Sequence, residues 1–168
     1  MMEREFSHLN AMGKLRMVDV TSKRVTQRSA MARCLVVTSA DMGALEPRED
    51  EIDPVICARI AGVSAAKRTS ELIPLCHNLN LNDVNVELTP HDRGIEVTTT
   101  VTATQRTGVE MEALVACAFA ALAILDTLQM ADPLALIDDL EVMKKEGGKS
   151  GDWGRLVERA DKEPPTSV

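Results

Sequence analysis

The sequence predicts an α+β fold in which two main helices pack on an antiparallel sheet. Three observations lead to this prediction. The 168 residues are the size of one domain. Apolar residues form β-branched or alternating stretches typical of strands, and two stretches begin with helix-start signals. The predicted order is strand, helix, strand, strand, helix, strand, which is the split βαβ pattern of ferredoxin-like domains.

The first strand is predicted at 30–38, where Cys34, Val36 and their neighbours form an apolar, β-branched stretch. The first helix is predicted to begin at Asp53-Pro54, because Asp accepts from free N–H groups and Pro suits the first helical position. We expect it to end near Leu72, since Pro74 disfavours helical geometry in the residue ahead of it.

A hairpin is predicted over 84–103, because apolar and polar residues alternate on both sides of a turn at 90–94. The second helix is predicted to start with Thr107-Gly108-Val109-Glu110, which has the form of a capping box, and to end near Met130. It is apolar nearly all round from Leu114 to Leu125, so we expect it to be buried.

The last strand is predicted at 136–143 and is followed by a polar loop. We expect a single domain over residues 1–153 and a mobile C-terminal tail over 154–168. The longest apolar run is shorter than the roughly 20 residues that span a bilayer, and the first residues form no apolar signal segment. These features favour a cytoplasmic protein with no membrane partner.

Composition argues against nucleic acid as a partner. The formal net charge is −7, which opposes salt-driven binding to a phosphate backbone. Aromatic residues make up 2% of the chain and leave little on which bases can stack. The four cysteines contain no Cys-x-x-Cys pair, so neither a zinc site nor a disulfide scaffold fits. We expect no metal site, and reduced thiols that are mostly buried.

Two side chains are candidates for chemistry, each with a structural alternative. Asp126 interrupts a long apolar helix face, where an unpaired buried carboxylate would cost several kcal/mol. It is either an exposed helix-end charge or a pocket carboxylate with a raised pKa. His77 follows Cys76 in an extended segment, where neighbours point to opposite sides and cannot form a dyad. His77 is therefore either structural or an acid or base acting alone.

Other charged groups also carry two interpretations. Lys67 and Arg68 can complement the negative end of the first helix. Glu110 and Glu112 lie about 200° apart round their helix, so they face different surroundings unless both surround its exposed start. The sequence Gly147-Gly148-Lys149-Ser150 lacks the first glycine of a P-loop, and is either a solvated loop or a phosphate-binding turn.

Six blocks together resemble the MoaC family over roughly Ser7 to Trp153. They are Met17-Val18-Asp19-Val20, Ala58-Arg59-Ile60-Ala61-Gly62, Ala66-Lys67-Arg68-Thr69, Leu72-Ile73-Pro74-Leu75-Cys76-His77, Arg106-Thr107-Gly108-Val109-Glu110-Met111-Glu112-Ala113-Leu114 and Gly147-Gly148-Lys149-Ser150-Gly151. The resemblance implies a ferredoxin-like subunit in a hexamer, built as a trimer of dimers, with active sites at subunit interfaces.

The resemblance also implies a reaction in molybdenum cofactor biosynthesis. It is that of a lyase, cyclic pyranopterin monophosphate synthase, which converts a cyclised dihydroguanosine triphosphate into cyclic pyranopterin monophosphate and pyrophosphate. No resident cofactor is expected, although Mg²⁺ can accompany the triphosphate. The homo-oligomer and this guanine-derived triphosphate are the expected partners.

The resemblance assigns the site residues. It implies that Asp126 is the catalytic aspartate and that His77, Glu110, Glu112 and Lys145 share in the chemistry. It also implies substrate-binding segments. We expect the following residues to bind substrate, the last three as cations for the phosphates: Leu75, Cys76, His77, Met111, Glu112, Lys67, Arg68 and Lys149. Asp126 lies about 21 Å beyond Glu112 along one helix, so a shared subunit interface or a long substrate is needed to join them.

Two positions depart from the family's pattern. Glu51 and Gln129 stand where the family carries lysines, a change of about −3 in charge that would weaken attraction to a polyanion. Arg48 is a candidate substitute for the missing loop lysine. The alternative function is therefore a catalytically impaired paralogue that binds a pterin or nucleotide, or that assembles with an active homologue. A further alternative is an enzyme for a less negatively charged nucleotide.

Overall fold

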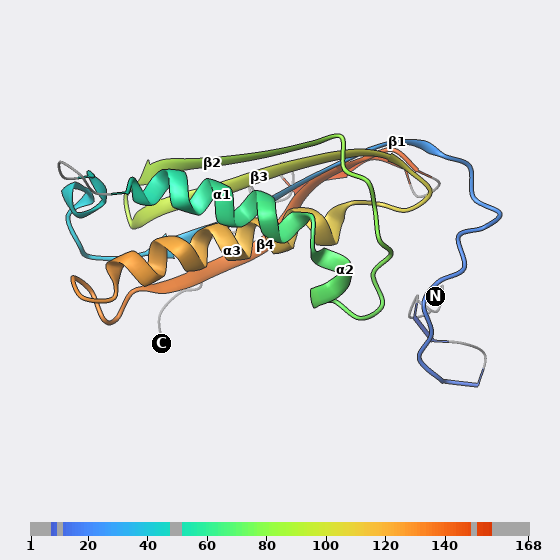
Figure 1. The fold of residues 1–168 in the computed structure, drawn as a ribbon, viewed down its shortest axis with the longest axis horizontal. Helices are drawn as coiled ribbons and strands as arrows, with labels where there is room; N and C mark the ends of the chain where they lie inside the picture. Colours follow the sequence, from blue (N-terminus) through green and yellow to red (C-terminus); the bar gives the residue numbers. More distant parts are fainter. Residues whose placement is uncertain (1–7, 10–11, 48–51, 149–150, 156–168) are drawn as a thin grey trace, which may run out of the picture.

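The computed structural model describes residues 8–9, 12–47, 52–148 and 151–155, and it contains one antiparallel sheet covered on one face by helices (Figure 1). Its strands are β1 (Thr26–Val37), β2 (Asp83–His91), β3 (Gly94–Gln105), β4 (Leu136–Glu146) and β5 (Trp153–Gly154), in the order β2-β3-β1-β4-β5. The helices are η1 (Met42–Leu45), α1 (Pro54–Ala66), α2 (Thr69–Leu72) and α3 (Glu110–Leu128). The predicted α+β fold and the order of its six main elements are confirmed.

The core lies between the sheet and the two long helices. Alternate residues of the central strands face the helices, as the register Cys34↔Val97 and Ala30↔Val101 shows, and these side chains are buried. Thr99 is a buried polar residue among them, but its hydroxyl donates to the carbonyl of Ala113 at 2.8 Å, so no hydrogen bond is lost.

The two long helices pack closely against each other. Gly62 of α1 faces α3, and a Cβ atom at this position would lie 2.9 Å from the carbonyl oxygen of Ala116. A small residue is therefore required where α1 packs against α3. Among the described residues, α3 is the helix that is long and apolar enough to cross a membrane, but half of it is buried inside the fold. It is thus a core helix, as its apolar sequence predicts.

Two of the four cysteines form a pair within this core. Cys34 on β1 and Cys117 on α3 are both fully buried, and their Sγ atoms lie 3.4 Å apart. Cys57 is exposed, Cys76 is half-buried, and all four are free thiols. Free thiols were expected, although burial holds for only two of the four.

Several predicted element ends were wrong for tertiary reasons. β1 begins at Thr26, four residues earlier than predicted, because its start pairs with β3 and its Ser29 with β4. α1 ends at Ala66, and a turn at Lys67 and Arg68 separates it from α2. The buried Thr69 hydroxyl donates to the Ala66 carbonyl at 2.9 Å and so stabilises this break, which the sequence pattern did not indicate.

The capping box predicted at Thr107 is also wrong. α3 begins at Glu110 after Val109, and no side chain of the described part of the chain caps its first turn. The carboxylate of Glu110 instead forms an ion pair with Lys145 of β4, at 2.6 Å between Oε1 and Nζ. A charged partner on the neighbouring strand offers Glu110 a charge-assisted hydrogen bond, and such bonds are stronger than neutral ones.

The C-terminal end of the sheet extends further than expected. β4 continues to Glu146, and the short β5 pairs with it through Lys145↔Trp153 and Lys144↔Gly154. Arg155 donates from Nε to the carbonyl of Val142 at 2.8 Å. Gly154 and Arg155 belong to the predicted tail but are held on the sheet, and the rest of that tail lies outside the described residues.

Candidate active site

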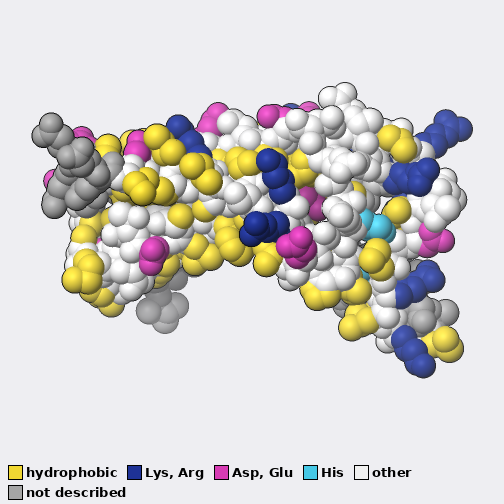
Figure 2. All heavy atoms as spheres, in the orientation of Figure 1, with side chains coloured by type: hydrophobic (Ala, Val, Ile, Leu, Met, Phe, Trp, Pro, Cys, Tyr) yellow, Lys and Arg dark blue, Asp and Glu magenta, His cyan; other side chains and the backbone are white. Residues whose placement is uncertain are grey.

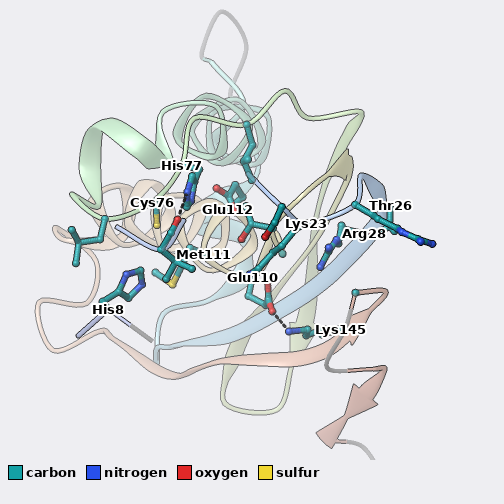
Figure 3. Close-up of a pocket in the computed structure, with 18 residues that line it drawn as sticks. His8, Lys23, Thr26, Arg28, Cys76, His77, Glu110, Met111, Glu112 and Lys145 are labelled. Atoms are coloured by element: carbon teal, nitrogen blue, oxygen red, sulfur yellow. Dashed lines mark hydrogen bonds and ion pairs between the residues drawn. The ribbon is translucent and has the colours of Figure 1, made fainter. Parts of the chain in front are cut away.

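A pocket of about 1180 Å³ lies at the start of α3 (Figure 3). Its walls come from the segment before β1, the start of β1, the segment after α2, the first turn of α3 and the end of β4. The pocket gathers residues far apart in the sequence. Seven predicted site residues line it: Leu75, Cys76, His77, Glu110, Met111, Glu112 and Lys145.

Both acidic residues of the first turn of α3 face this pocket. Glu110 and Glu112 point to different sides of an ideal helix, but each lines the pocket because the cavity surrounds the helix start. The second of the two alternatives raised from the sequence is therefore the correct one. Glu110 is fixed by its ion pair with the partly buried Lys145.

Glu112 carries an unusual protonation state. Its side chain is buried, and this desolvation raises its pKa from 4.5 to about 7. A hydrogen bond from its own backbone N–H opposes the rise, and the negative charge of Glu110 adds to it. The carboxyl group of Glu112 therefore titrates near neutral pH. A carboxyl group in this state can either donate or accept a proton under physiological conditions.

Cys76 lies beside this carboxyl group and stays a thiol. Burial raises its pKa, and the charge of Glu112 raises it further. A nucleophilic thiolate requires the opposite shift. Cys76 therefore shapes the pocket and can donate a weak hydrogen bond there.

The structure fixes the tautomer of His77. Its Nε2 lies 2.9 Å from the carbonyl oxygen of Val18, and a carbonyl oxygen can only accept. The proton must therefore be on Nε2, which leaves a lone pair on Nδ1 of the neutral ring. His77 therefore has a structural role, because it holds the N-terminal segment through Val18. It is also available as an acid or base, because it lines the pocket.

Three basic residues in the pocket were missed by sequence reasoning: Lys23, Arg24 and Arg28. Residues 14–28 contain five Lys or Arg and a single Asp, in a chain of net charge −7. This local reversal of charge was the available signal. It marks the segment that leads into β1 as a surface for an anion.

Arg28 is held in an unusual way for a buried cation. It is 9% exposed, and its Nε and Nη2 donate to the carbonyl oxygens of Gln105 and Arg106 at 3.4 and 3.3 Å. Among the described residues it forms no ion pair. A buried guanidinium without a carboxylate partner favours binding of an anionic ligand, because the ligand supplies the missing charge.

Two glycines allow the backbone to approach Arg28. Gly147 and Gly148 have φ values of 82° and 90°, which side chains with a Cβ rarely adopt. A Cβ at Gly147 would overlap the Gln27 carbonyl, and one at Gly148 would overlap the guanidinium. Gly147 and Gly148 therefore lie against the start of β1, and Gly148 lines the pocket.

The other predicted residues lie elsewhere. Asp126 is exposed near the opposite end of α3, about 21 Å along the helix from Glu112. Lys67 and Arg68 are exposed at the junction of α1 and α2 and do not line the pocket. Gln129 is the exposed C-cap of α3. Lys149, Glu51 and Arg48 lie outside the described residues.

The charge of the pocket has the opposite sign to that of the whole chain. Four cationic side chains line it, from Lys23, Arg24, Arg28 and Lys145, against the carboxyl groups of Glu110 and Glu112. The described lining is therefore net positive even when both carboxyl groups are ionised. The arrangement fits a ligand with several negative charges at one end, and it offers groups that exchange protons at the other.

Known proteins with similar sequences are biosynthetic enzymes. The model of the MoaC family matches residues 17–148. Cyclic pyranopterin monophosphate synthase 2 of Mycobacterium tuberculosis strain H37Rv is 49% identical over 153 residues, 90% of this chain and 92% of its own. Cyclic pyranopterin monophosphate synthases of Chloroflexus aurantiacus and Streptomyces coelicolor are each 46% identical, over 90% and 89% of this chain and 95% and 89% of their own.

Proposed function

The chain belongs to the MoaC family and has a role in molybdenum cofactor biosynthesis, and from this premise we propose that it is itself a cyclic pyranopterin monophosphate synthase. In this proposal it acts as a lyase on cyclised dihydroguanosine triphosphate, and it releases cyclic pyranopterin monophosphate and pyrophosphate. The observation that carries the proposal is the pocket, which joins the buried Arg28, without an ion pair among the described residues, to a carboxyl group that titrates near neutral pH.

The cations would bind the triphosphate. Arg28 is anchored by backbone carbonyls, and Lys23 and Lys145 line the same pocket. Loss of pyrophosphate builds negative charge on the departing oxygens, and cations fixed beforehand stabilise that charge. The ion pair with Glu110 keeps the Lys145 ammonium in place before substrate arrives.

Proton transfer would fall to Glu112 and His77. Opening and closure of the rings require protons to be added and removed at neutral pH, where the best acid or base has a pKa near 7. Glu112 meets this requirement because of its burial. His77 offers a lone pair on Nδ1, since its Nε2–H is bound to Val18.

Asp126 lies about 21 Å from Glu112 along α3, so it reaches substrate in the pocket of its own subunit only if the substrate spans that distance. We propose a homo-oligomer, a hexamer built as a trimer of dimers, in which Asp126 completes a neighbour's pocket. Exposed apolar side chains on the helical layer support association (Figure 2). They include Ile56 and Ile60 on α1 and Phe119 and Leu122 on α3.

The proposal places the enzyme in the cytoplasm and gives it no resident cofactor. Mg²⁺ would enter as a companion of the triphosphate and not as a metal bound in advance. Replacement of the two family lysines by Glu51 and Gln129 would lower turnover without abolishing it. The reason is that Lys23, Arg24 and Arg28 also supply positive charge at the pocket.

The test is release of pyrophosphate from cyclised dihydroguanosine triphosphate by the purified full-length protein. Lys145→Met should lower kcat/KM at least about 100-fold, since it removes a cation and leaves Glu110 unpaired. Lys144→Met is the matched control, because Lys144 is the neighbour of Lys145 on β4 but does not line the pocket. Wild-type protein that binds the nucleotide but releases no pyrophosphate would refute the enzyme and favour the binding paralogue.

The double variant Glu51→Lys, Gln129→Lys tests the effect of the two replaced lysines. If a neighbouring subunit brings its Gln129 to the pocket together with Asp126, we expect the variant to raise kcat/KM about tenfold or more, because one opposing charge is removed and two cations are added. Unchanged turnover would show that the remaining basic residues already suffice.

A further inference from the structure

His8 lines the same pocket but has no role in the site described so far. It lies beside Met111 and Cys76, away from Arg28 and Lys145 (Figure 3). It also precedes residues 17–148, the stretch that the family model matches. The His8 imidazole is thus an additional polar group at the end of the pocket away from Arg28 and Lys145.

The backbone around His8 fixes its place. The N–H of Arg16 donates to the carbonyl of His8 at 2.9 Å, and Leu9 pairs with Leu15 in an antiparallel bridge. The segment from Arg16 to Val18 is then held by His77, whose Nε2 donates to Val18. Two imidazoles thus hold neighbouring carbonyls of one short segment, and both line the pocket.

The hydrogen bond of the His8 ring defines which nitrogen is available. Nδ1 lies 3.3 Å from the carbonyl oxygen of Arg16, which can only accept, so Nδ1 carries the proton. The neutral ring then has its lone pair on Nε2, and no described residue donates to that atom. His8 and His77 are therefore opposite tautomers.

A ligand with a triphosphate at one end and a guanine-derived ring at the other has a defined orientation in such a pocket. The phosphates favour the end with Arg28 and Lys23, so the ring occupies the end with Cys76, Met111 and His8. The amino-pyrimidine edge of that ring carries N–H donors, and a donor that loses water needs an acceptor. The lone pair of His8 Nε2 is an acceptor at that end.

We propose that His8 is a substrate-binding residue whose Nε2 accepts a hydrogen bond from an N–H of the guanine-derived ring. This inference rests on the proposed function and adds a specificity-determining contact from the N-terminal segment. It predicts that His8 acts on affinity for the ring more than on the chemical step.

Two amide substitutions separate this role from a purely structural one. In His8→Gln the amide reaches the position of Nε2, so an acceptor toward the ligand is kept. In His8→Asn the amide reaches the position of Nδ1, so the bond to Arg16 is kept and the acceptor is lost. A structural role is rescued by Asn, whereas a substrate-binding role is rescued by Gln.

The experiment measures the Kd of cyclised dihydroguanosine triphosphate by calorimetry, and kcat and KM by pyrophosphate release, for the full-length wild type and both variants. We expect His8→Asn to raise Kd and KM about tenfold, with kcat changed less than threefold, and His8→Gln to stay within about threefold of wild type. Equal melting temperatures of the three proteins establish that folding is unaffected.

The outcomes distinguish the two proposals. Wild-type binding with an unaffected His8→Asn variant overturns the role of His8 and leaves the proposed function intact. Rescue by Asn and not by Gln overturns it in favour of a structural clasp. A wild type that does not bind the nucleotide overturns the proposed function, and with it the role of His8.

Discussion

At the scale of single residues, the environment decides what each side chain of the pocket can do. Glu110 and Glu112 are two residues apart in one helical turn. One is a carboxylate fixed by Lys145, and the other shares a proton with solvent near neutral pH because it is buried. This difference in protonation cannot be inferred from the residue type, because both are glutamates.

Glu112→Gln tests the protonation of the buried carboxyl group through protein stability. Folding raises the pKa of Glu112 from 4.5 to about 7, so the folded state binds a proton more tightly than the unfolded state. The contribution of Glu112 is therefore fully present below about pH 4.5 and is lost as pH rises through 7. Glutamine does not titrate, so the variant should become the more stable protein by up to about 3 kcal/mol at pH 8.5.

Melting temperatures of wild type and variant from pH 5 to pH 8.5 measure this difference. We expect the gap to widen with pH, and kcat to fall about 100-fold or more because glutamine cannot exchange the proton. A gap that stays constant across this range would show that Glu112 has an ordinary pKa.

The candidate site was predicted in part from the sequence. The resemblance located the segments around His77 and Glu112, which do lie together. It did not locate Arg28. The Arg28 side chain is held at the pocket by hydrogen bonds to carbonyl oxygens at the end of β3, which are nearly 80 residues away in the sequence. Burial of Glu112 likewise depends on the whole fold.

At the scale of elements, the turn after β4 joins the sheet to the pocket. Gly147 follows β4, adopts a φ of 82° and lies against the backbone of Gln27. Its N–H donates to Asp152 at 2.7 Å, so the turn is closed on itself. The start of β1, where Arg28 lies, is therefore packed against this turn.

Gly147→Ala should destabilise the protein more than Gly151→Ala does. Both glycines have positive φ, which costs alanine about 1–2 kcal/mol. A Cβ at Gly151 would meet nothing within 4 Å, whereas one at Gly147 would overlap a backbone carbonyl. We expect a further penalty of about 1–3 kcal/mol at Gly147, measured by urea denaturation. Equal losses would contradict the close approach of the turn to β1.

The elements that the sequence predicted well are those with strong local signals. The Asp53 cap at the start of α1 is present, since its side chain accepts from Val55 and Ile56. The capping box predicted at Thr107 had an equally good local pattern but does not form. Glu110 instead pairs with Lys145 of β4, which is distant in the sequence but close in the fold. Local patterns do not contain such tertiary competition.

At the scale of the whole molecule, α3 separates two groups that the proposed reaction needs. Glu112 lies at its first turn and Asp126 near its last, at opposite ends of the helical layer (Figure 1). A shared site between subunits follows only if a neighbour brings its own Asp126 to the pocket.

Mixing two inactive variants tests this arrangement. His77→Ala and Asp126→Asn should each lower turnover strongly when assayed alone. If a pair of subunits shares each site, protein refolded from an equal mixture should regain about one quarter of wild-type activity, because mixed pairs contain one intact site. No recovery, with mixed oligomers verified by mass spectrometry, would contradict a site shared between subunits in this way.

Alkylation of the buried pair Cys34 and Cys117 would measure the rate at which the core opens. An alkylating reagent should modify the exposed Cys57 first and the half-buried Cys76 more slowly, while the pair stays protected until α3 leaves the sheet. Mass spectra should therefore show one modification, then a second, and finally two much slower ones that rise together. Separate slow rates for the two thiols would mean that strand and helix can be exposed independently. A common rate for the two thiols would give the frequency with which the hydrophobic core opens transiently in the native protein.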